Sequence, residues 1–321
     1  LKSLKEDLSS AVGEKVFDSP NQRISLSTFR NHVDEMYGVF SSGNKRYAHW
    51  MLVSSTSMCV SCHTQLPQSA DRKFGGIGDI KNLSGEKLFE EAEFMFISRR
   101  FDSSLAAYTR LIDGYPKNSL SVDSLNTSVR RVLTIYARVR RDPVGGALQF
   151  EKLFRNRKLP EFVRNNSKAW MGLFNIWKKE GPIDVEKSSG KDIISFVEKQ
   201  LKKGLWDKMI EAGDPRAVTN LRVSGVLYEF LHLHPKGEYT PQMLYYLAKT
   251  EEALGSDFFF AINELYLKEC IEGYPKSSIA KDCYKEYEEG VTVSYSGSSG
   301  THIPADVQKN LRRLRIMVYG K

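Results

Sequence analysis

Two thiols and an imidazole lie within five residues of one another in the first quarter of the chain. Cys59 and Cys62 are separated by two residues, and His63 follows directly. Thiols at this spacing can add across the two vinyl groups of a porphyrin, and the adjacent imidazole can bind the iron as its proximal ligand. With 4 Cys and 6 His in 321 residues, chance would produce this pattern about 10⁻³ times per chain. The sequence therefore predicts one covalently bound haem c.

The motif resembles the haem attachment sequence of monohaem c-type cytochromes. Because haem attachment occurs outside the cytoplasm in bacteria, the resemblance implies an exported protein in the periplasm or another extracytoplasmic compartment. We therefore expect that a targeting segment before Leu1 has been removed. Predicted helices precede the motif and only a short tail follows it, which is similar to its late position in cytochromes c-prime. That second resemblance covers motif position only.

Two other interpretations of the Cys pair compete with haem attachment. A half zinc site would need a distant pair of ligands, either His232 and His234 or Cys270 and Cys283. A redox dithiol of the Cys-x-x-Cys type would lie at a helix start after a strand. No second pair has zinc-finger spacing, and the residues before Cys59 do not have a strand pattern. Both alternatives are therefore less favoured than haem.

The sixth position on a haem iron would be filled from elsewhere in the chain or left open. The candidates are Met36, on the apolar face of a predicted helix, and His32, one turn earlier. Trp50 and Tyr47 are expected to pack on the macrocycle. Met36 and His32 also have simple structural interpretations, as a core residue and a partly exposed polar residue.

Cys270 and Cys283 are 13 residues apart on consecutive predicted helices. An exported protein would allow them to form a disulfide. Two buried free thiols that pack as small hydrophobic residues are the alternative.

The chain is predicted to be all-α with two domains. Residues 1–80 form a small helical haem domain that ends in a Gly-rich linker near residues 71–78. Apolar spacing predicts helices at residues 1–18, from Ser27 or Thr28 to 40, and at 45–55. Pro20 is expected to end the first of these.

Residues 81–321 are predicted to form a solenoid of helix pairs, closed by a C-terminal capping helix at 305–318. Residues 111–120 and 270–279 are identical at six of ten positions and share the phrase Gly-Tyr-Pro-Lys. Setting Pro116 at the closing proline places Leu88, Ala92 and Tyr108 at signature positions, and the pattern resembles a tetratricopeptide repeat. The resemblance implies a surface that binds a protein or peptide.

A net charge of +8 and a pI near 9.1 favour an acidic partner or an anionic surface. No nucleic-acid module and no phosphate loop, nucleophile elbow or zinc-protease signature is present, so an enzyme is not predicted. No apolar run is long enough to span a bilayer, which predicts a location peripheral to membranes. One basic segment predicts either a solvated helix face or a docking stripe, and it contains Arg130, Arg131, Arg138, Arg140 and Arg141.

Together these patterns predict an electron-transfer or haem-bearing accessory subunit that docks on a larger periplasmic or membrane assembly through its helical repeats. An assembly scaffold with a mainly structural haem is one alternative. A five-coordinate haem that senses a gas or peroxide is another.

Overall fold

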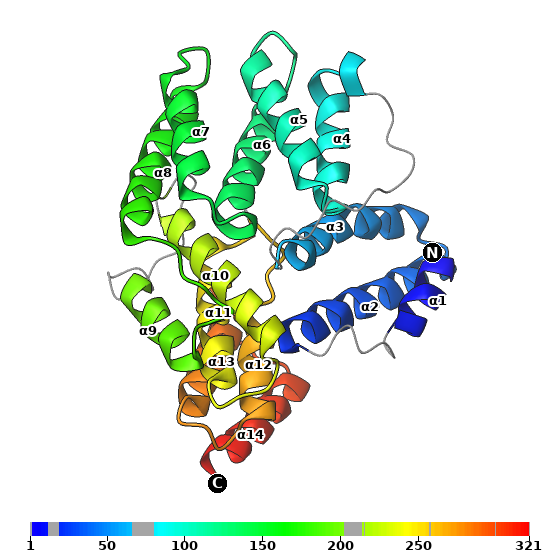
Figure 1. The fold of residues 1–321 in the computed structure, drawn as a ribbon. Coiled ribbons are helices and arrows are strands. Elements are labelled where there is room, and N and C mark those ends of the chain that lie inside the picture. The colour runs from blue at the N-terminus through cyan, green and yellow to red at the C-terminus, as the bar shows by residue number, and fades with distance from the viewer. Residues whose placement is uncertain are drawn as a thin grey trace.

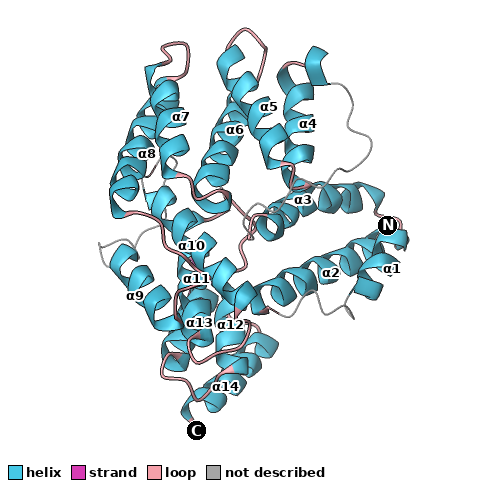
Figure 2. Cartoon of the chain, viewed as in Figure 1, coloured by secondary structure: helices cyan, strands magenta, loops and turns pink. Residues whose placement is uncertain are grey.

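The protein is all-α, as the sequence predicts (Figures 1 and 2). The computed structural model describes residues 2–11, 19–65, 80–201, 214, 216–256, 258–298 and 300–320. Within these ranges the β-structure is one short antiparallel pair, β1 (Ser296–Gly297) and β2 (Gly300–Thr301). No described helix is long and apolar enough to cross a lipid bilayer.

The first three helices form a projecting hairpin with a short helix beside it. They are α1 (Lys2–Ala11), α2 (Pro20–Ser41) and α3 (Lys45–His63). Figure 1 shows α2 and α3 extending away from the rest of the molecule, with α1 against α2. Apolar residues at helical spacing give this hairpin a small core of its own, composed of Val33, Met36, Ala48 and Met51.

Two predicted helix limits in this region were wrong. The second helix begins at Pro20, a residue that was predicted to end the first helix. Proline fits the first turn of a helix because its φ is already helical and its missing N–H has no partner there. The third helix does not end at residue 55 but continues through His63, so the whole motif is helical.

The central region runs from residue 80 to 180 and lies in the upper part of Figure 1. It begins with a short 3₁₀ turn, Ile80–Asn82. The helices that follow are α4 (Gly85–Ile97), α5 (Phe101–Gly114), α6 (Val122–Thr134), a π-helical segment (Ile135–Val139), α7 (Pro143–Arg155) and α8 (Glu161–Glu180). Neighbouring helices pack together and share one hydrophobic core.

The C-terminal region has a second core and lies in the lower part of Figure 1. Its helices are α9 (Gly190–Leu201), α10 (Arg216–Leu233), α11 (Thr240–Leu254), α12 (Asn263–Gly273), α13 (Ala280–Ser294) and α14 (Ala305–Tyr319). The last of these packs on α12 and α13, where a capping helix was predicted.

The two copies of the repeated phrase occupy equivalent places. Residues 111–120 close α5 and lead into α6, and residues 270–279 close α12 and lead into α13. In each case the helix packs against its neighbours on both sides along the chain. This packing is the one expected of stacked helix pairs, while membership of the tetratricopeptide family stays a prediction.

The base of the α2–α3 hairpin is packed into the rest of the molecule. Val60 near the end of α3 belongs to the core of the central region, and Ile24 near the start of α2 belongs to the C-terminal core. The α2–α3 hairpin therefore shares hydrophobic cores with both later regions. The predicted Gly-rich linker lies outside the described residues.

Candidate haem site

The Cys-x-x-Cys-His motif forms the last turns of α3. Asn44 caps the start of this helix by accepting a hydrogen bond from the Tyr47 amide at 3.2 Å. Neither Gly nor Pro occurs within residues 45–63, so nothing in the sequence interrupts the helix before Thr64. Positions three and four apart lie on one face of a helix. The thiols of Cys59 and Cys62 and the imidazole of His63 are therefore presented on the same side of α3.

This face is half-buried. Cys59, Cys62 and His63 are each of intermediate exposure, and neither thiol is bonded to another cysteine. Their neighbours on the opposite face, Val60 and Ser61, are buried. The Ser61 hydroxyl accepts a hydrogen bond from the Phe260 amide at 2.8 Å, which ties the end of α3 to the loop before α12.

The ring of His63 is oriented by the end of α4. Its Nδ1 is hydrogen-bonded to the carbonyl oxygen of Ile97. Because a carbonyl can only accept, Nδ1 must carry the proton, which leaves the lone pair of Nε2 available. Burial lowers the pKa of His63, although the bond to Ile97 acts in the opposite direction. The neutral ring with a free Nε2 is the form that binds iron, and a backbone partner for the other nitrogen is usual for such ligands.

Arg99 also contacts the last turn of α3. Its Nη1 donates a hydrogen bond to the carbonyl oxygen of His63 at 2.6 Å. Arg99 adopts a φ of +63°, a left-handed conformation that is unusual for a residue with a side chain. The end of α4 thus contacts the side chain of His63, and the loop after it contacts the backbone of the same residue.

A buried polar network lies beneath the motif. The Gln65 Oε1 accepts from the Asn21 side chain at 2.9 Å, and its Nε2 donates to the Ser25 hydroxyl at 2.9 Å. The same amide lies 3.5 Å from the hydroxyl of Tyr266. Gln65 is thereby joined to both α2 and α12.

Arg138 extends this network into the centre of the molecule. Its guanidinium is fully buried, pairs with Glu251 and donates to the Ser224 hydroxyl at 3.0 and 2.8 Å. The guanidinium lies 3.9 Å from the ring centroid of Phe259. It also lies 3.4 Å from the hydroxyl of Thr64, the residue that directly follows the motif. The prediction that Arg138 belongs to a solvated basic face or docking stripe was therefore wrong. A buried guanidinium needs these partners because desolvation would otherwise be very costly.

The candidate distal ligands do not lie beside His63. Met36 is fully buried in the same small core as Met51. The Nε2 of His32 lies 2.9 Å from the Met51 carbonyl oxygen. Met51 is roughly 18 Å from His63 along α3, at about 1.5 Å per residue. The structure therefore places both candidates too far along the hairpin to share one iron with His63.

Tyr47 and Trp50 also lie away from the motif. Their rings stack with centroids 5.6 Å apart, and both side chains are exposed near the closed end of the hairpin. They are not positioned to pack on a macrocycle held at the other end of α3.

The zinc interpretation of the Cys pair has no complete set of ligands in the described part of the chain. No three His, Cys, Asp or Glu side chains converge there closely enough to hold a metal ion directly. A zinc site needs such a cluster, whereas in haem attachment the thiols bond to the porphyrin and only the imidazole binds the metal.

The properties of the thiols differ from those of a reactive dithiol. Burial, with a smaller contribution from the neighbouring Cys59, raises the pKa of Cys62 to about 11. Burial also raises the pKa of Cys59. Redox dithiols have lowered pKa values and lie at helix N-termini, whereas this pair is at a C-terminus.

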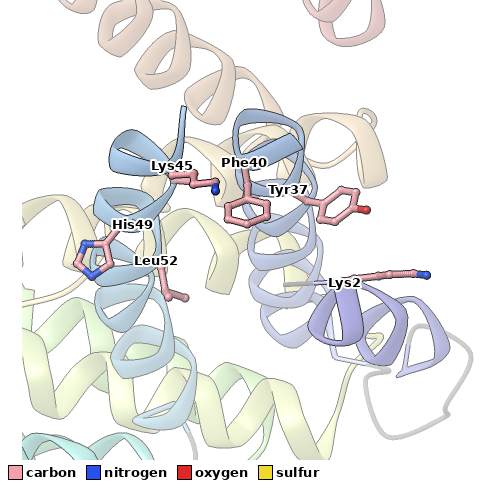
Figure 3. Close-up of a pocket in the computed structure, with 7 residues that line it drawn as sticks. Lys2, Tyr37, Phe40, Lys45, His49 and Leu52 are labelled. Carbon is pink, nitrogen blue, oxygen red and sulfur yellow. The ribbon is translucent and has the colours of Figure 1, made fainter. Parts of the chain in front are cut away.

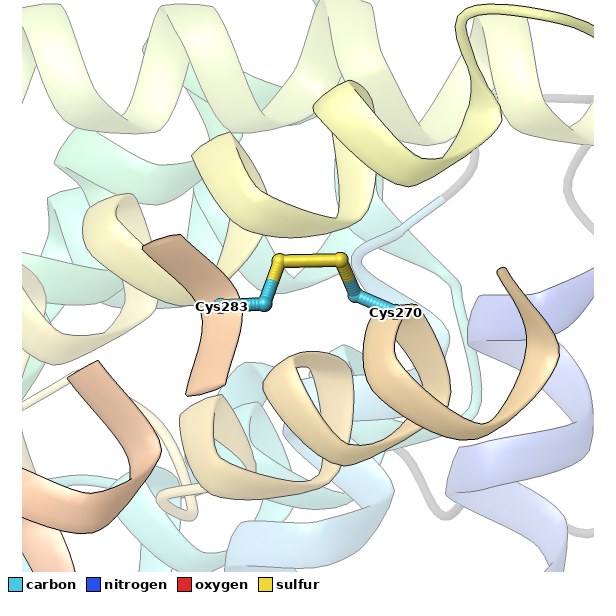
Figure 4. Close-up of a disulfide and its surroundings, with 2 residues drawn as sticks. All are labelled: Cys270 and Cys283. Atoms are coloured by element: carbon cyan, nitrogen blue, oxygen red, sulfur yellow. A yellow bond between two sulfur atoms is a disulfide. The ribbon is translucent and has the colours of Figure 1, made fainter. Parts of the chain in front are cut away.

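Cys270 and Cys283 are joined by a disulfide between α12 and α13 (Figure 4). Their Cα atoms are 6.4 Å apart, and both residues are fully buried. They are therefore not available to complete a zinc site with Cys59 and Cys62.

Ile97, Arg99 and Gln65 contact or adjoin the motif and were not found by sequence reasoning. A backbone carbonyl carries no sequence signal, and neither Arg99 nor Gln65 belongs to a recognisable pattern.

Comparison of the chain with known protein families, curated proteins and solved structures gives no match.

Proposed function

We propose that this protein is a monohaem c-type cytochrome that acts as an electron-transfer or haem-bearing accessory subunit. The observation that carries the proposal is the arrangement at the end of α3. Two unpaired, half-buried thiols share a helix face with an imidazole whose Nδ1 is bonded to Ile97 and whose Nε2 is left available.

Each residue has a definite role in this proposal. Cys59 and Cys62 hold the porphyrin through thioether bonds, and His63 binds the iron through Nε2. Ile97 and Arg99 orient the histidine. When bound, the haem would supply one-electron chemistry between the ferrous and ferric states.

The remaining parts of the molecule support an exported accessory subunit. A buried disulfide is typical of proteins outside the cytoplasm. Stacked helix pairs commonly bind a protein partner, and the net charge of +8 favours an acidic one. We therefore propose a periplasmic or other extracytoplasmic location, with docking on a larger redox or envelope assembly.

The test is to export the full chain in a bacterium that attaches haem to proteins and to record the pyridine haemochrome spectrum. We expect a c-type spectrum, and haem that stays on the chain after denaturation. The Cys59→Ala/Cys62→Ala variant should lose the covalent haem, while Cys270→Ala/Cys283→Ala, the matched control, should keep it. Absence of haem from the exported wild-type protein would overturn the proposal.

A second function, binding of a small ligand at an open iron position, is favoured by one observation. Neither Met36 nor His32 lies beside His63, and residues 66–79 contain neither Met nor His. Carbon monoxide separates the two functions. A ferrous spectrum that shifts with carbon monoxide supports a sensor or peroxide-binding role, whereas no shift supports electron transfer through a six-coordinate haem.

A further inference from the structure

The closed end of the α2–α3 hairpin exposes an unusual number of large apolar side chains. Trp50 is 60% exposed, Val53 57%, Leu52 45%, Tyr47 44% and Phe40 42%. All five lie within residues 40–53, in the half of the hairpin nearer its closed end, and Figure 1 shows the hairpin projecting from the rest of the molecule. Exposed apolar side chains this close together in the chain usually mark a binding site. We call these five residues the tip patch.

The charged residues within the segment that carries the tip patch, residues 40–53, are both cationic. Lys45 and Arg46 are exposed at the start of α3, and that helix contains no acidic residue. The nearby acidic residues on α1 and α2 include Glu6 and Asp34, which form ion pairs with lysine or arginine on those same helices. The outer face of α3 therefore combines cations with aromatic and aliphatic side chains.

A groove of about 640 Å³ runs beside this patch between α1, α2 and α3. Its walls are mixed, with lysine ends beside aromatic and aliphatic groups. Figure 3 shows the side chains around it: Lys2, Tyr37, Phe40, Lys45, His49 and Leu52. Ammonium groups beside an apolar floor can bind a phosphate and the hydrocarbon attached to it at the same time.

We propose that the tip patch docks the protein on the surface of an anionic phospholipid bilayer. Trp and Tyr rings with Lys and Arg are the side chains that favour the boundary between headgroups and hydrocarbon. A projecting hairpin can enter that boundary without moving the body of the molecule. The net charge of +8 would attract the protein to the same surface before contact. This proposal goes beyond the haem function and does not depend on it.

An acidic protein is the competing occupant of the patch. The projecting shape favours the membrane, because a hairpin end offers the small, convex surface that enters a bilayer. A typical protein interface is broader and depends on complementary shape.

The experiment is co-sedimentation of the full chain with vesicles. One set contains phosphatidylcholine alone, and the other contains phosphatidylcholine with phosphatidylglycerol. We expect binding to the anionic set at low salt, weakening at high salt, and little binding to the neutral set. The Lys45→Ala/Arg46→Ala variant should bind roughly 30-fold more weakly, since each basic residue near a membrane contributes about a fivefold effect. Trp50→Ala should weaken binding roughly tenfold.

Matched variants elsewhere on the surface serve as controls. Lys178→Ala/Lys179→Ala removes an exposed cation pair from the end of α8, and Leu148→Ala removes a side chain that is 63% exposed. Both should bind like the wild type, and circular dichroism should show that every variant is folded. Binding that is absent from anionic vesicles, or equal in the tip and control variants, would overturn the proposal. If the protein binds poly-glutamate but not vesicles, and Lys45→Ala/Arg46→Ala loses the binding to poly-glutamate, the membrane proposal is overturned in favour of an acidic protein partner.

Discussion

His63 at the end of α3 is hydrogen-bonded through its ring to the carbonyl oxygen of Ile97 at the end of α4. The two residues are 34 positions apart in the chain. Two residues beyond Ile97, Arg99 binds the carbonyl of His63 itself. The orientation of the candidate iron ligand thus depends on the end of α4 and the loop after it, neither of which carries a motif.

Substitution of Arg99 should loosen this loop. Arg99→Ala removes the 2.6 Å bond to His63 and should lower the free energy of unfolding by about 1.5–3 kcal/mol. Arg99→Gly removes the same bond but suits the φ of +63°, so it should be about 1 kcal/mol more stable than Arg99→Ala. Urea unfolding measures both. Arg100→Ala is the control for loss of a neighbouring charge. The reverse order of the Gly and Ala variants would show that this backbone conformation is not kept in solution.

Met36 and His32 should not affect the haem. Met36→Leu conserves core volume and His32→Ala removes only a bond to Met51, so neither change reaches the end of α3. The visible spectra of both variants, oxidised and reduced, should match the wild type. His63→Gly is the positive control, because it should change the spectrum and be restored by added imidazole. Altered coordination in Met36→Leu would contradict the placement described above.

The Arg138–Glu251 pair should be among the most sensitive sites in the protein. Arg138→Met leaves the Glu251 carboxylate buried without its partner and should cost about 3–5 kcal/mol of unfolding free energy. Arg138→Met/Glu251→Leu removes both charges and should recover part of that loss. Guanidinium unfolding gives the comparison. Lys187→Ala, which breaks an exposed pair with Asp184, is the control and should have no measurable effect. Equal stability of Arg138→Met and wild type would contradict this assignment.

Glu180 should make stability depend on pH. Burial acts to raise its pKa, but hydrogen bonds from Arg222 and Gln200 outweigh burial and lower the pKa below the ordinary value of 4.5. A lowered carboxyl pKa stabilises the fold above the unfolded value, and the contribution is lost as pH falls through the folded pKa. The melting temperature of wild type should therefore exceed that of Glu180→Gln at pH 7, and the difference should shrink below about pH 4.5. In an Arg222→Met background, the difference in melting temperature caused by Glu180→Gln should change little with pH. A wild-type advantage unchanged down to pH 3 would contradict the prediction.

The disulfide between Cys270 and Cys283 should stabilise the C-terminal region. The bond joins residues that are 13 positions apart in the chain, and loops of about this length contribute roughly 3 kcal/mol. Cys270→Ala/Cys283→Ala should show a loss of that size in thermal unfolding. Reductant should destabilise wild type and leave the double variant unchanged. Equal responses to reductant in the two proteins would show that the bond does not form.

Local patterns in the sequence predicted much of the fold. The repeat signature set by Pro116 placed Leu88, Ala92 and Tyr108 at helical positions, and these residues lie in α4 and α5, with Pro116 just after the end of α5. Residue spacing also predicted that Cys59, Cys62 and His63 would act at one site, although the predicted helix ended before them, and the structure places all three in the last turns of α3. The start of α2 was missed because proline both ends and begins helices, and only the neighbouring residues decide which.

The sequence by itself determined an all-α chain with a Cys-x-x-Cys-His motif, because helical periodicity and motif spacing are properties of neighbouring residues. Only the tertiary structure decided what surrounds the motif. It brought Ile97 to His63, buried Arg138 against Glu251 and left Met36 far from the candidate ligand. Contacts of this kind join segments that are distant in the chain, and they depend on how whole helices pack. The fate of a single arginine or methionine is therefore set by the helices around it rather than by its own neighbours in sequence.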